Sequence, residues 1–232
     1  MKAMILAAGR GERMRPLTDH TPKPLLMVGK DPLIVWHIKH LAKAGFIDIV
    51  INHAWLGQQL EETLGNGAKW HVHLHYSAEK EGGLETAGGI ATALPLLGTE
   101  HFLVVNGDIF TSIDFLSLRE HTQYLAENQT HIILVPNPEH HPQGDFVLDA
   151  NNKVQDIPES QNKYTFSGVG IYHPSFFKHT PAHQKAKLAP LLKEAMHQQQ
   201  VLGQLHTGLW LDVGTTERLA LANDLAKTES FL

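Results

Sequence analysis

Hydrophobic runs of strand length alternate with helix-period patterns through the first half of the chain. The predicted strands are residues 2–8, 47–52, 70–76 and 102–106, and the predicted helices are residues 32–42, 56–64 and 89–97. Apolar residues recur every three or four positions in these helices. Gly45 and Gly65 follow two of them, where helices commonly end. The alternation predicts an α/β fold, with a mixed, mostly parallel central sheet flanked by helices.

The second half of the chain has a different pattern. Residues 146–149 and 153–157 flank a turn at Ala150, Asn151 and Asn152, which predicts a β-hairpin. Residues 188–199 and 215–227 have helical periodicity. Because no flexible linker is apparent, we expect a single domain over residues 1–232, with halves of approximately 1–115 and 116–232 around a cleft.

Composition narrows the class of protein. Hydrophobic residues make up 42% of the 232 residues, which is enough for a substantial core, and the net charge is -5. Without a long basic run, a nucleic-acid partner is not expected. The absence of cysteine excludes disulfides and thiolate chemistry. No run is long and apolar enough for a membrane, no obligate protein partner is evident, and we expect a cytoplasmic protein.

The first apolar run could be interpreted as a short signal peptide or as a buried strand. The run is brief, and Arg10 and Arg13 follow it at once, which favours the strand. Gly9 and Gly11 in the same turn would let backbone amides approach a polyphosphate closely. The turn lacks the third glycine of a dinucleotide fingerprint, because position 14 is Met14, and it lacks the Gly-Lys-Ser/Thr of a P-loop. An ordinary turn with surface arginines is the alternative.

Lys23 lies between Pro22 and Pro24 shortly after this turn. We expect the two prolines to hold it in a stiff, extended segment. A lysine fixed in this way would be a preorganised cation for a phosphate. The alternative is a solvated lysine in a proline-rich loop.

Two aspartates lie next to predicted elements, in places where a metal could bind. Asp108 comes just beyond the apolar run 102–106, and Asp212 precedes the last predicted helix. Magnesium prefers oxygen ligands and usually takes only one or two carboxylates. Two aspartates that converged would suit it, whereas Asp212 could instead cap the helix.

Residues 9–18 and 22–24 together resemble the signature of the sugar-1-phosphate nucleotidylyltransferases. Glu12 and Met14 depart from its commonest wording, but the glycines, Arg13 and Lys23 fit. The resemblance implies a Rossmann-like nucleotidyltransferase fold and a Mg2+ cofactor held by Asp108 and Asp212. It also implies that the first half binds the nucleoside triphosphate and the second half binds the sugar.

The same resemblance implies roles for individual residues. Arg13 would hold the leaving β- and γ-phosphates, and Lys23 would hold the sugar phosphate and the transferring group. The residues implied to bind the nucleotide are Ala8, Gly9, Gly11, Arg13, Thr86 and Gly88, and those implied to bind the sugar are Asn106, Gly144 and Glu159. Thr86 could alternatively cap a helix. Glu85 and Ser160 stand where the family usually has Gly and Lys.

Residues 11–18 and 51–59 are similar to the short bacterial N-acetylmuramate α-1-phosphate uridylyltransferases, which act in peptidoglycan recycling. This similarity implies UTP and N-acetylmuramate α-1-phosphate as substrates. The alternatives within the class are a mannose-1-phosphate guanylyltransferase and a glucose-1-phosphate thymidylyltransferase. A non-catalytic nucleotide-sugar sensor is the alternative from another class.

The chain has 17 histidines, which raises the question of a zinc site. His71, His73 and His75 would share one face of the predicted strand 70–76. Zinc usually needs three or four well-placed ligands, and nothing else in the sequence completes such a set. We therefore expect a polar strand face there, and a polar loop at His140 and His141.

Overall fold

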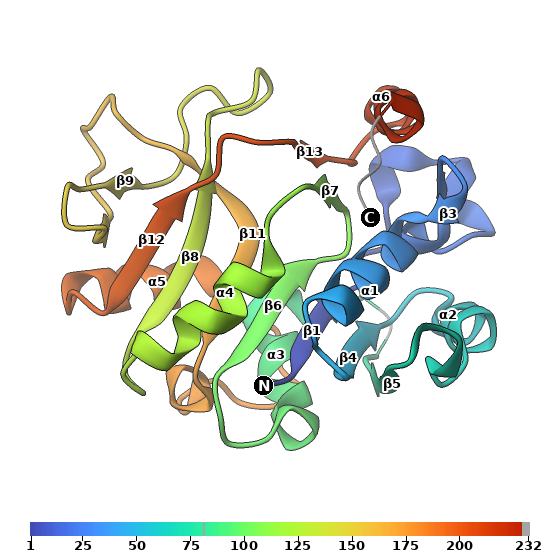
Figure 1. Ribbon diagram of the computed structural model, residues 1–232, viewed down its shortest axis with the longest axis horizontal. Coiled ribbons are helices and arrows are strands. Elements are labelled where there is room, and N and C mark those ends of the chain that lie inside the picture. The colour runs from blue at the N-terminus through green and yellow to red at the C-terminus, as the bar shows by residue number, and fades with distance from the viewer. Residues whose placement is uncertain (81, 229–232) are drawn as a thin grey trace.

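Figure 1 shows the computed structural model of the chain, which describes residues 1–80 and 82–228. A seven-stranded sheet runs through it in the order β12-β8-β11-β6-β1-β4-β5. Its strands are β1 (Ala3–Leu6), β4 (Asp48–His53), β5 (His73–Ala78), β6 (Phe102–Asn106), β8 (Thr130–Val135), β11 (Thr165–Tyr172) and β12 (Val201–Leu205). Only β11 pairs antiparallel with its neighbours in this sheet. The predicted mixed, mostly parallel sheet is therefore confirmed.

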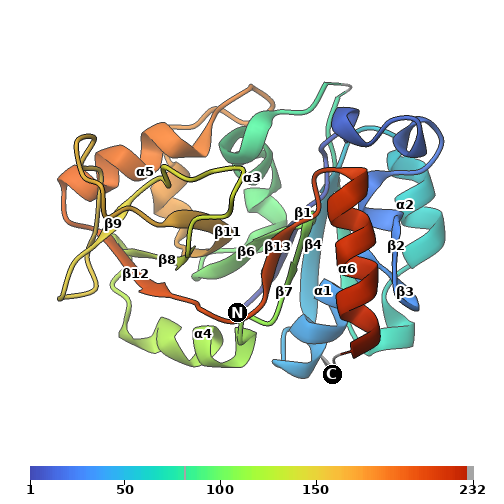
Figure 2. The same ribbon diagram turned by 90° about the horizontal axis from the view of Figure 1, so that it is seen from above.

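Helices cover both faces of the sheet (Figure 2). One face carries α1 (Leu33–Lys43), α2 (Gly57–Leu64) and α4 (Phe115–His121), and the other carries α3 (Glu85–Leu97) and α5 (Leu188–His197). Successive residues of β1 enter opposite cores: Ile5 belongs to the same core as Ile38 of α1, while Met4 belongs to the other core, with Ile90 of α3. Burying each such side chain contributes roughly 1.5–3 kcal/mol, so the sheet is the rigid part of the molecule.

Three short antiparallel pairs complete the structure. They join β2 (Met27–Val28) to β3 (Asp31–Pro32), β7 (Ile109–Thr111) to β13 (Trp210–Asp212), and β9 (Val147–Leu148) to β10 (Val154–Gln155). The last helix, α6 (Thr216–Thr228), packs against β2. Single turns of 3-10 helix occupy Glu12–Met14, Leu17–Asp19, Lys23–Leu25, Ala68–Trp70, Thr122–Tyr124 and Pro174–Phe177.

Most predicted elements are present, with boundaries shifted by a few residues, and the strand 102–106 has the bounds that were predicted. The hairpin around Asn151 is also confirmed. The prediction of a strand over residues 70–76 is partly wrong, because Trp70 ends a 3-10 turn and His71 has a φ of 60°. His71 therefore does not share a strand face with His73.

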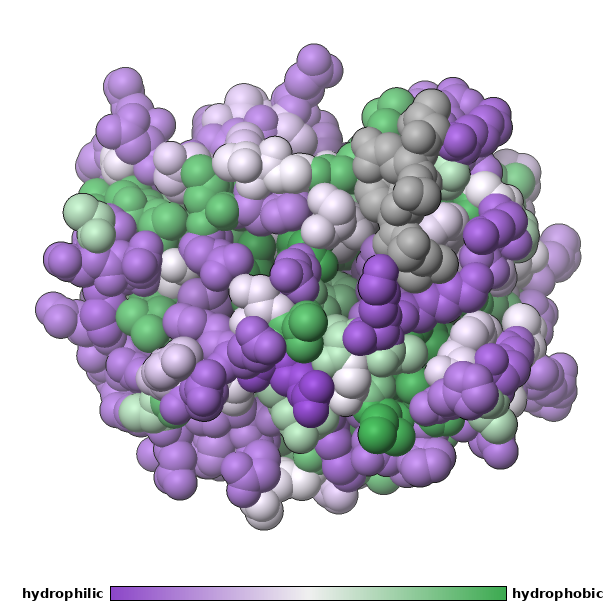
Figure 3. Space-filling model, viewed as in Figure 1, coloured by the Kyte–Doolittle hydropathy of each residue, from purple (hydrophilic) through white to green (hydrophobic). Residues whose placement is uncertain are grey.

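Three strands of the second half, β8, β11 and β12, were not predicted. All six residues of β8 are buried, so this strand lacks the alternation of polar and apolar residues that marks a half-exposed strand. Both halves of the chain contribute strands to the one sheet. Hydrophilic residues cover most of the face seen in Figure 3, with hydrophobic residues in small groups. None of the described helices has the length and apolarity that a membrane span requires.

One histidine of β8 is buried beside a second histidine. His131 is only 3% exposed, and its ring centroid lies 4.4 Å from that of His121. Burial, with a smaller effect of the neighbouring His121, lowers the pKa of His131 to about 4. Its neutral form is therefore the one that the folded state accommodates.

We predict that the free energy of unfolding falls as the pH drops from about 6.5 towards 4. In this window the unfolded chain protonates His131 while the folded chain does not. This difference lowers the free energy of unfolding by about 3 kcal/mol. Above pH 6.5 the effect is absent, because both states hold the neutral ring. Urea denaturation of wild type and of His131→Gln at pH 7.5 and pH 4.5 measures it. The variant should lose less stability in acid than wild type, whereas the exposed His71→Gln should match wild type. Equal acid loss in all three proteins would contradict the prediction.

Candidate active site

The loop after β1 is held tightly in place. Its first amide, Ala7 N–H, donates to Oδ1 of Asn52 at 2.9 Å, and the Thr18 hydroxyl donates to the Gly11 carbonyl oxygen at 2.8 Å. Gly11 has a φ of 72°, and a Cβ added there would lie 2.9 Å from Cγ2 of Thr18 and 3.1 Å from Cβ of Lys23. Only glycine adopts this positive φ without strain and also has no Cβ to collide with these side chains. The loop and Lys23 are therefore packed against each other.

Lys23 is buried and paired. The prediction of an extended segment is wrong, because Lys23–Leu25 forms a turn of 3-10 helix that follows Pro22. The lysine side chain is 9% exposed, and its Nζ lies 2.7 Å from Oδ2 of Asp108. The surrounding chain has thus already removed most of the water from this cation. It is a preorganised positive charge rather than a solvated lysine.

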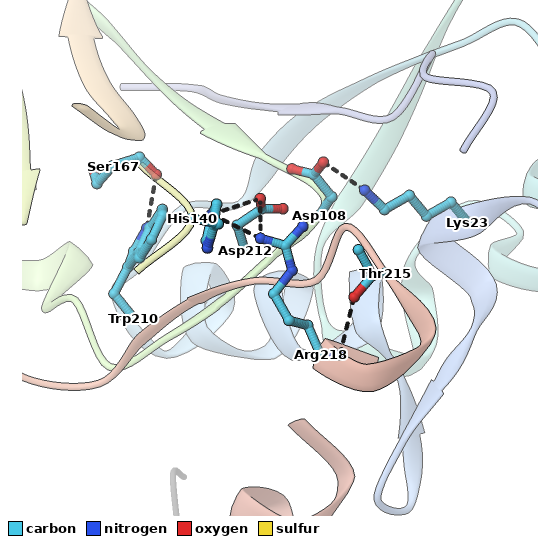
Figure 4. A network of polar contacts seen from close by, with 8 residues as sticks. All are labelled: Lys23, Asp108, His140, Ser167, Trp210, Asp212, Thr215 and Arg218. Atoms are coloured by element: carbon cyan, nitrogen blue, oxygen red, sulfur yellow. Dashed lines mark hydrogen bonds and ion pairs between the residues drawn. The ribbon is translucent and has the colours of Figure 1, made fainter. Parts of the chain in front are cut away.

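The two aspartates converge. Strand β7 begins directly after Asp108 and pairs with β13, so that Ile109 lies opposite Asp212. In addition, the Val213 N–H donates to the Asp108 carbonyl oxygen at 2.8 Å. Figure 4 shows both carboxylates in one cluster of polar side chains, with Lys23 on the Asp108 side.

A second cation pairs with Asp212. Nη1 of Arg218 lies 3.1 Å from Oδ2 of Asp212, and it also donates to Nε2 of His140 at 2.7 Å. Desolvation and, secondly, the charge of Arg218 lower the pKa of His140. Sequence reasoning missed Arg218 and placed His140 in a polar loop without a role in the site. The one available signal was the position of Arg218 in the first turn of the helix that follows Asp212.

Arg13 approaches the same cluster. A Cβ added to Gly214 would lie 2.9 Å from Nη2 of Arg13, 2.6 Å from Nη2 of Arg218 and 3.0 Å from Oδ1 of Asp212. Two guanidinium groups therefore meet one carboxylate at a glycine that leaves room for them. This places Arg13 on the Asp212 side of the cluster.

A cavity of about 570 Å³ opens beside Asp108, at the carboxyl ends of β1, β4 and β6. Open α/β sheets bind ligands at this end of their strands. Of the residues predicted for the site, it is lined by Ala8, Gly9, Lys23, Thr86, Asn106 and Asp108. Its wall also includes Asn52, Trp55, Glu79 and Glu85, which sequence reasoning did not assign to the site.

Glu79 is a fixed part of the cavity wall. Its Oε1 accepts a hydrogen bond from Nδ2 of Asn52 at 2.6 Å, and its Oε2 accepts one from the Leu84 N–H at 2.8 Å. A Cβ added to Gly89 would lie 2.6 Å from Oε1 of Glu79, so glycine makes room for this carboxylate. The only signal in the sequence was a polar residue directly after a strand.

Several residues predicted to bind ligands lie outside the cavity wall. A Cβ added to Gly88 would lie 2.1 Å from the Gln184 carbonyl oxygen, so this glycine allows α3 to pack against residues 184–186. Thr86, by contrast, lines the cavity, and it does not cap α3, because Leu84 occupies the N-cap position and makes no side-chain capping bond. Gly144 has a φ of 62° in a loop beside Asn137, and Glu159 is exposed.

The aspartate pair fits a magnesium ion in its chemistry. It offers two carboxylates, the number magnesium usually takes from a protein. Within residues 1–80 and 82–228, no three His, Asp or Glu side chains are grouped as ligands. His73 and His75 instead share Oδ1 of Asp48, at 3.3 Å and 3.1 Å.

Comparisons with known proteins identify the family of the chain. Residues 2–229 match the family described as Nucleotidyl transferase. An N-acetylmuramate alpha-1-phosphate uridylyltransferase of Neisseria meningitidis serogroup B is 58% identical over 97% of this chain and 98% of its own length. A mannose-1-phosphate guanyltransferase of Schizosaccharomyces pombe is 31% identical over 92% of the chain, which spans 61% of that protein.

The fold is also shared with a solved structure. A Bacillus anthracis protein assigned as a glucose-1-phosphate thymidylyltransferase superposes with a TM-score of 0.87, over 100% of this chain and 97% of its own, at 24% identity. The likeness at this identity concerns the fold. The match of almost the whole sequence decides the membership: this chain belongs to the nucleotidyl transferase family.

Proposed function

We propose that the chain transfers a uridylyl group from UTP to N-acetylmuramate α-1-phosphate, forming UDP-N-acetylmuramate and pyrophosphate. The observation that carries a nucleotidyl transfer is the convergence of Asp108, Asp212 and Lys23 beside the cavity. The choice of substrates rests on the likeness to the meningococcal uridylyltransferase. The proposed setting is peptidoglycan recycling in the cytoplasm.

In this proposal the cavity holds UTP. The amides of Ala8 and Gly9 line it and can approach the phosphates, with Gly11 keeping the loop in shape. Thr86 lies on the wall near the base, and Gly88 acts by letting α3 pack closely. Arg13, on the Asp212 side, binds the β- and γ-phosphates. Asn106, Gly144 and Glu159 remain the proposed sugar-binding residues.

The reaction needs alignment more than it needs a base. An oxygen of the sugar phosphate forms a bond to the α-phosphorus of UTP, and the bond from that phosphorus to the β-phosphate oxygen breaks. Because the attacking oxygen is already anionic, no proton has to be removed first. Lys23, buried and directed at Asp108, can hold the sugar phosphate and the transferring phosphoryl group. Holding two mutually repelling anions together accounts for much of the catalysis.

Asp108 and Asp212 would hold the magnesium ion, which supplies charge neutralisation for the phosphates when bound. In the structure Lys23 and Arg218 balance these two carboxylates. The alternatives within the class are guanylyl transfer to mannose 1-phosphate and thymidylyl transfer to glucose 1-phosphate. The sensor alternative is disfavoured because the proposed cations and carboxylates are all present.

The first prediction from the proposed function concerns the metal. Asp108→Asn should lower kcat/KM on the order of 100-fold, because an amide is a poorer magnesium ligand than a carboxylate. Asp212→Asn should behave in the same way, and both should weaken Mn2+ binding in calorimetry. The matched control is Asp114→Asn on α4, where Asp114 accepts hydrogen bonds from the Leu116 and Ser117 amides. Asparagine caps a helix equally well, so this variant should keep full activity. Near-normal turnover in a folded Asp108→Asn protein would refute the metal assignment.

The second prediction concerns the cations. Lys23→Met should lower kcat at least tenfold, about 1.4 kcal/mol, while UTP affinity changes much less. Arg13→Ala should weaken UTP binding as well, since its proposed partners are the leaving phosphates. Lys39→Met is the control, because Lys39 forms a similar ion pair at 2.6 Å with Asp31. Steady-state kinetics and UTP calorimetry measure both effects. If neither Lys23 nor Arg13 alters the kinetics tenfold, the phosphate roles are wrong.

The third prediction tests the function itself. With magnesium held fixed, pyrophosphate release should be fastest for UTP with N-acetylmuramate α-1-phosphate. The panel pairs four nucleoside triphosphates with the 1-phosphates of N-acetylmuramate, N-acetylglucosamine, glucose and mannose. Preference for mannose 1-phosphate with GTP, or for glucose 1-phosphate with dTTP, would overturn the substrates and leave the reaction class. No turnover with any pair would favour the sensor.

A further inference from the structure

The cluster around Asp212 carries more positive charge than its one carboxylate can balance. Arg218 pairs with Asp212 at 3.1 Å, and Arg13 approaches the same carboxylate across Gly214. Among the described residues, Arg13 forms no ion pair and Arg218 pairs only with Asp212. Two guanidinium groups against one carboxylate leave an excess of one positive charge. A partly desolvated cluster of this kind attracts an anion.

The cluster lies away from the base-binding end of the cavity. Figure 4 shows Lys23 approaching Asp108 from one side and His140 approaching Asp212 from the other. Neither Arg218 nor His140 lines the cavity beside Asp108. His140 belongs to the loop between β8 and β9, the same loop that contains Gly144. The excess charge is therefore on the side of the site where the second half of the chain would meet the sugar.

The geometry of Arg218 suits a carboxylate. Its side chain is 14% exposed, and one of its nitrogens, Nη1, is fixed by both Asp212 and His140. A guanidinium has a planar fork of donors that matches a carboxylate, so a fixed guanidinium is a specific receptor for one. If Asp212 bound the metal, it would balance less of the positive charge of Arg218. Arg218 would then attract an anion more strongly.

We infer that Arg218, oriented by His140, binds the carboxylate of the sugar substrate and so selects an acidic sugar 1-phosphate over neutral ones. This inference rests on the proposed function, which leaves the group that recognises the acidic sugar unidentified. The sugar substrate carries two anions, its carboxylate and its phosphate. Lys23, on the other side of the aspartates, is assigned to the phosphate, which leaves the carboxylate for Arg218.

The test compares two sugars that differ only in the lactyl ether with its carboxylate. The readout is the ratio of kcat/KM for N-acetylmuramate α-1-phosphate to that for N-acetylglucosamine α-1-phosphate, each with UTP. Arg218→Met should lower this ratio at least about 30-fold, because it leaves the carboxylate desolvated without a partner. Arg218→Lys, which keeps the charge but loses the fork, should lower it less. His140→Ala should lower it in the same direction by a smaller factor.

The ratio separates recognition of the carboxylate from other roles of Arg218. Support of Asp212, or binding of the sugar phosphate, would reduce turnover of both sugars equally and leave the ratio unchanged. Calorimetry with UDP-N-acetylmuramate and UDP-N-acetylglucosamine repeats the comparison without turnover. Arg119→Met on α4, whose arginine donates to the Ala44 carbonyl oxygen, is the control for loss of an arginine and should keep the wild-type ratio.

The outcomes are distinct. If wild type prefers the acidic sugar and folded Arg218→Met keeps that preference in both assays, the inference is wrong and the proposed function stands. If wild type does not prefer the acidic sugar, the proposed substrate fails and the inference with it. A ratio that collapses in Arg218→Met and is partly kept in Arg218→Lys supports both.

Discussion

The short pairing between β7 and β13 is the contact on which the candidate site depends. The two strands come from distant parts of the chain, and their register places Asp212 opposite Ile109, next to Asp108. The pairing is reinforced by the Thr111 hydroxyl, which donates to the Leu209 carbonyl oxygen, and by Trp210, whose Nε1 donates to the Ser167 carbonyl oxygen on β11. A shift of one residue would turn Asp212 to the other face of its strand. The two carboxylates would then no longer converge.

The large sheet gives this small pairing a rigid support. Strands β1 and β6 are buried on both faces, and Asp108 follows β6 with one glycine after Asn106. A Cβ added to that Gly107 would lie 2.7 Å from the Leu6 carbonyl oxygen, so the turn towards Asp108 needs a glycine. The loop after β1 is tied to β4 through Asn52. Residues that would meet the ligands therefore stand on fixed strand ends.

Two ion pairs lie in the candidate site. Lys23 lies beside Asp108 and Arg218 lies beside Asp212, so each partly buried carboxylate has a cation next to it. Each pair holds a positive and a negative side chain next to each other. A phosphate and a divalent cation can each find a partner of the opposite sign there.

The sequence by itself determined the class of fold, because hydrophobic periodicity follows directly from the geometry of strands and helices. It also indicated Arg13, Lys23, Asp108 and Asp212 as candidates, through the resemblance of their segments to the motifs of the sugar-1-phosphate nucleotidylyltransferases and, for the aspartates, through the preference of Mg2+ for oxygen ligands. Only the tertiary structure decided that Asp108 and Asp212 converge, that Lys23 sits in a 3-10 turn, and that Arg218 and His140 meet Asp212. It likewise showed that Gly88 lies outside the cavity wall, where this glycine lets α3 pack against residues 184–186. These features depend on strand register and on contacts between distant segments, and a local pattern of residues carries no information about either.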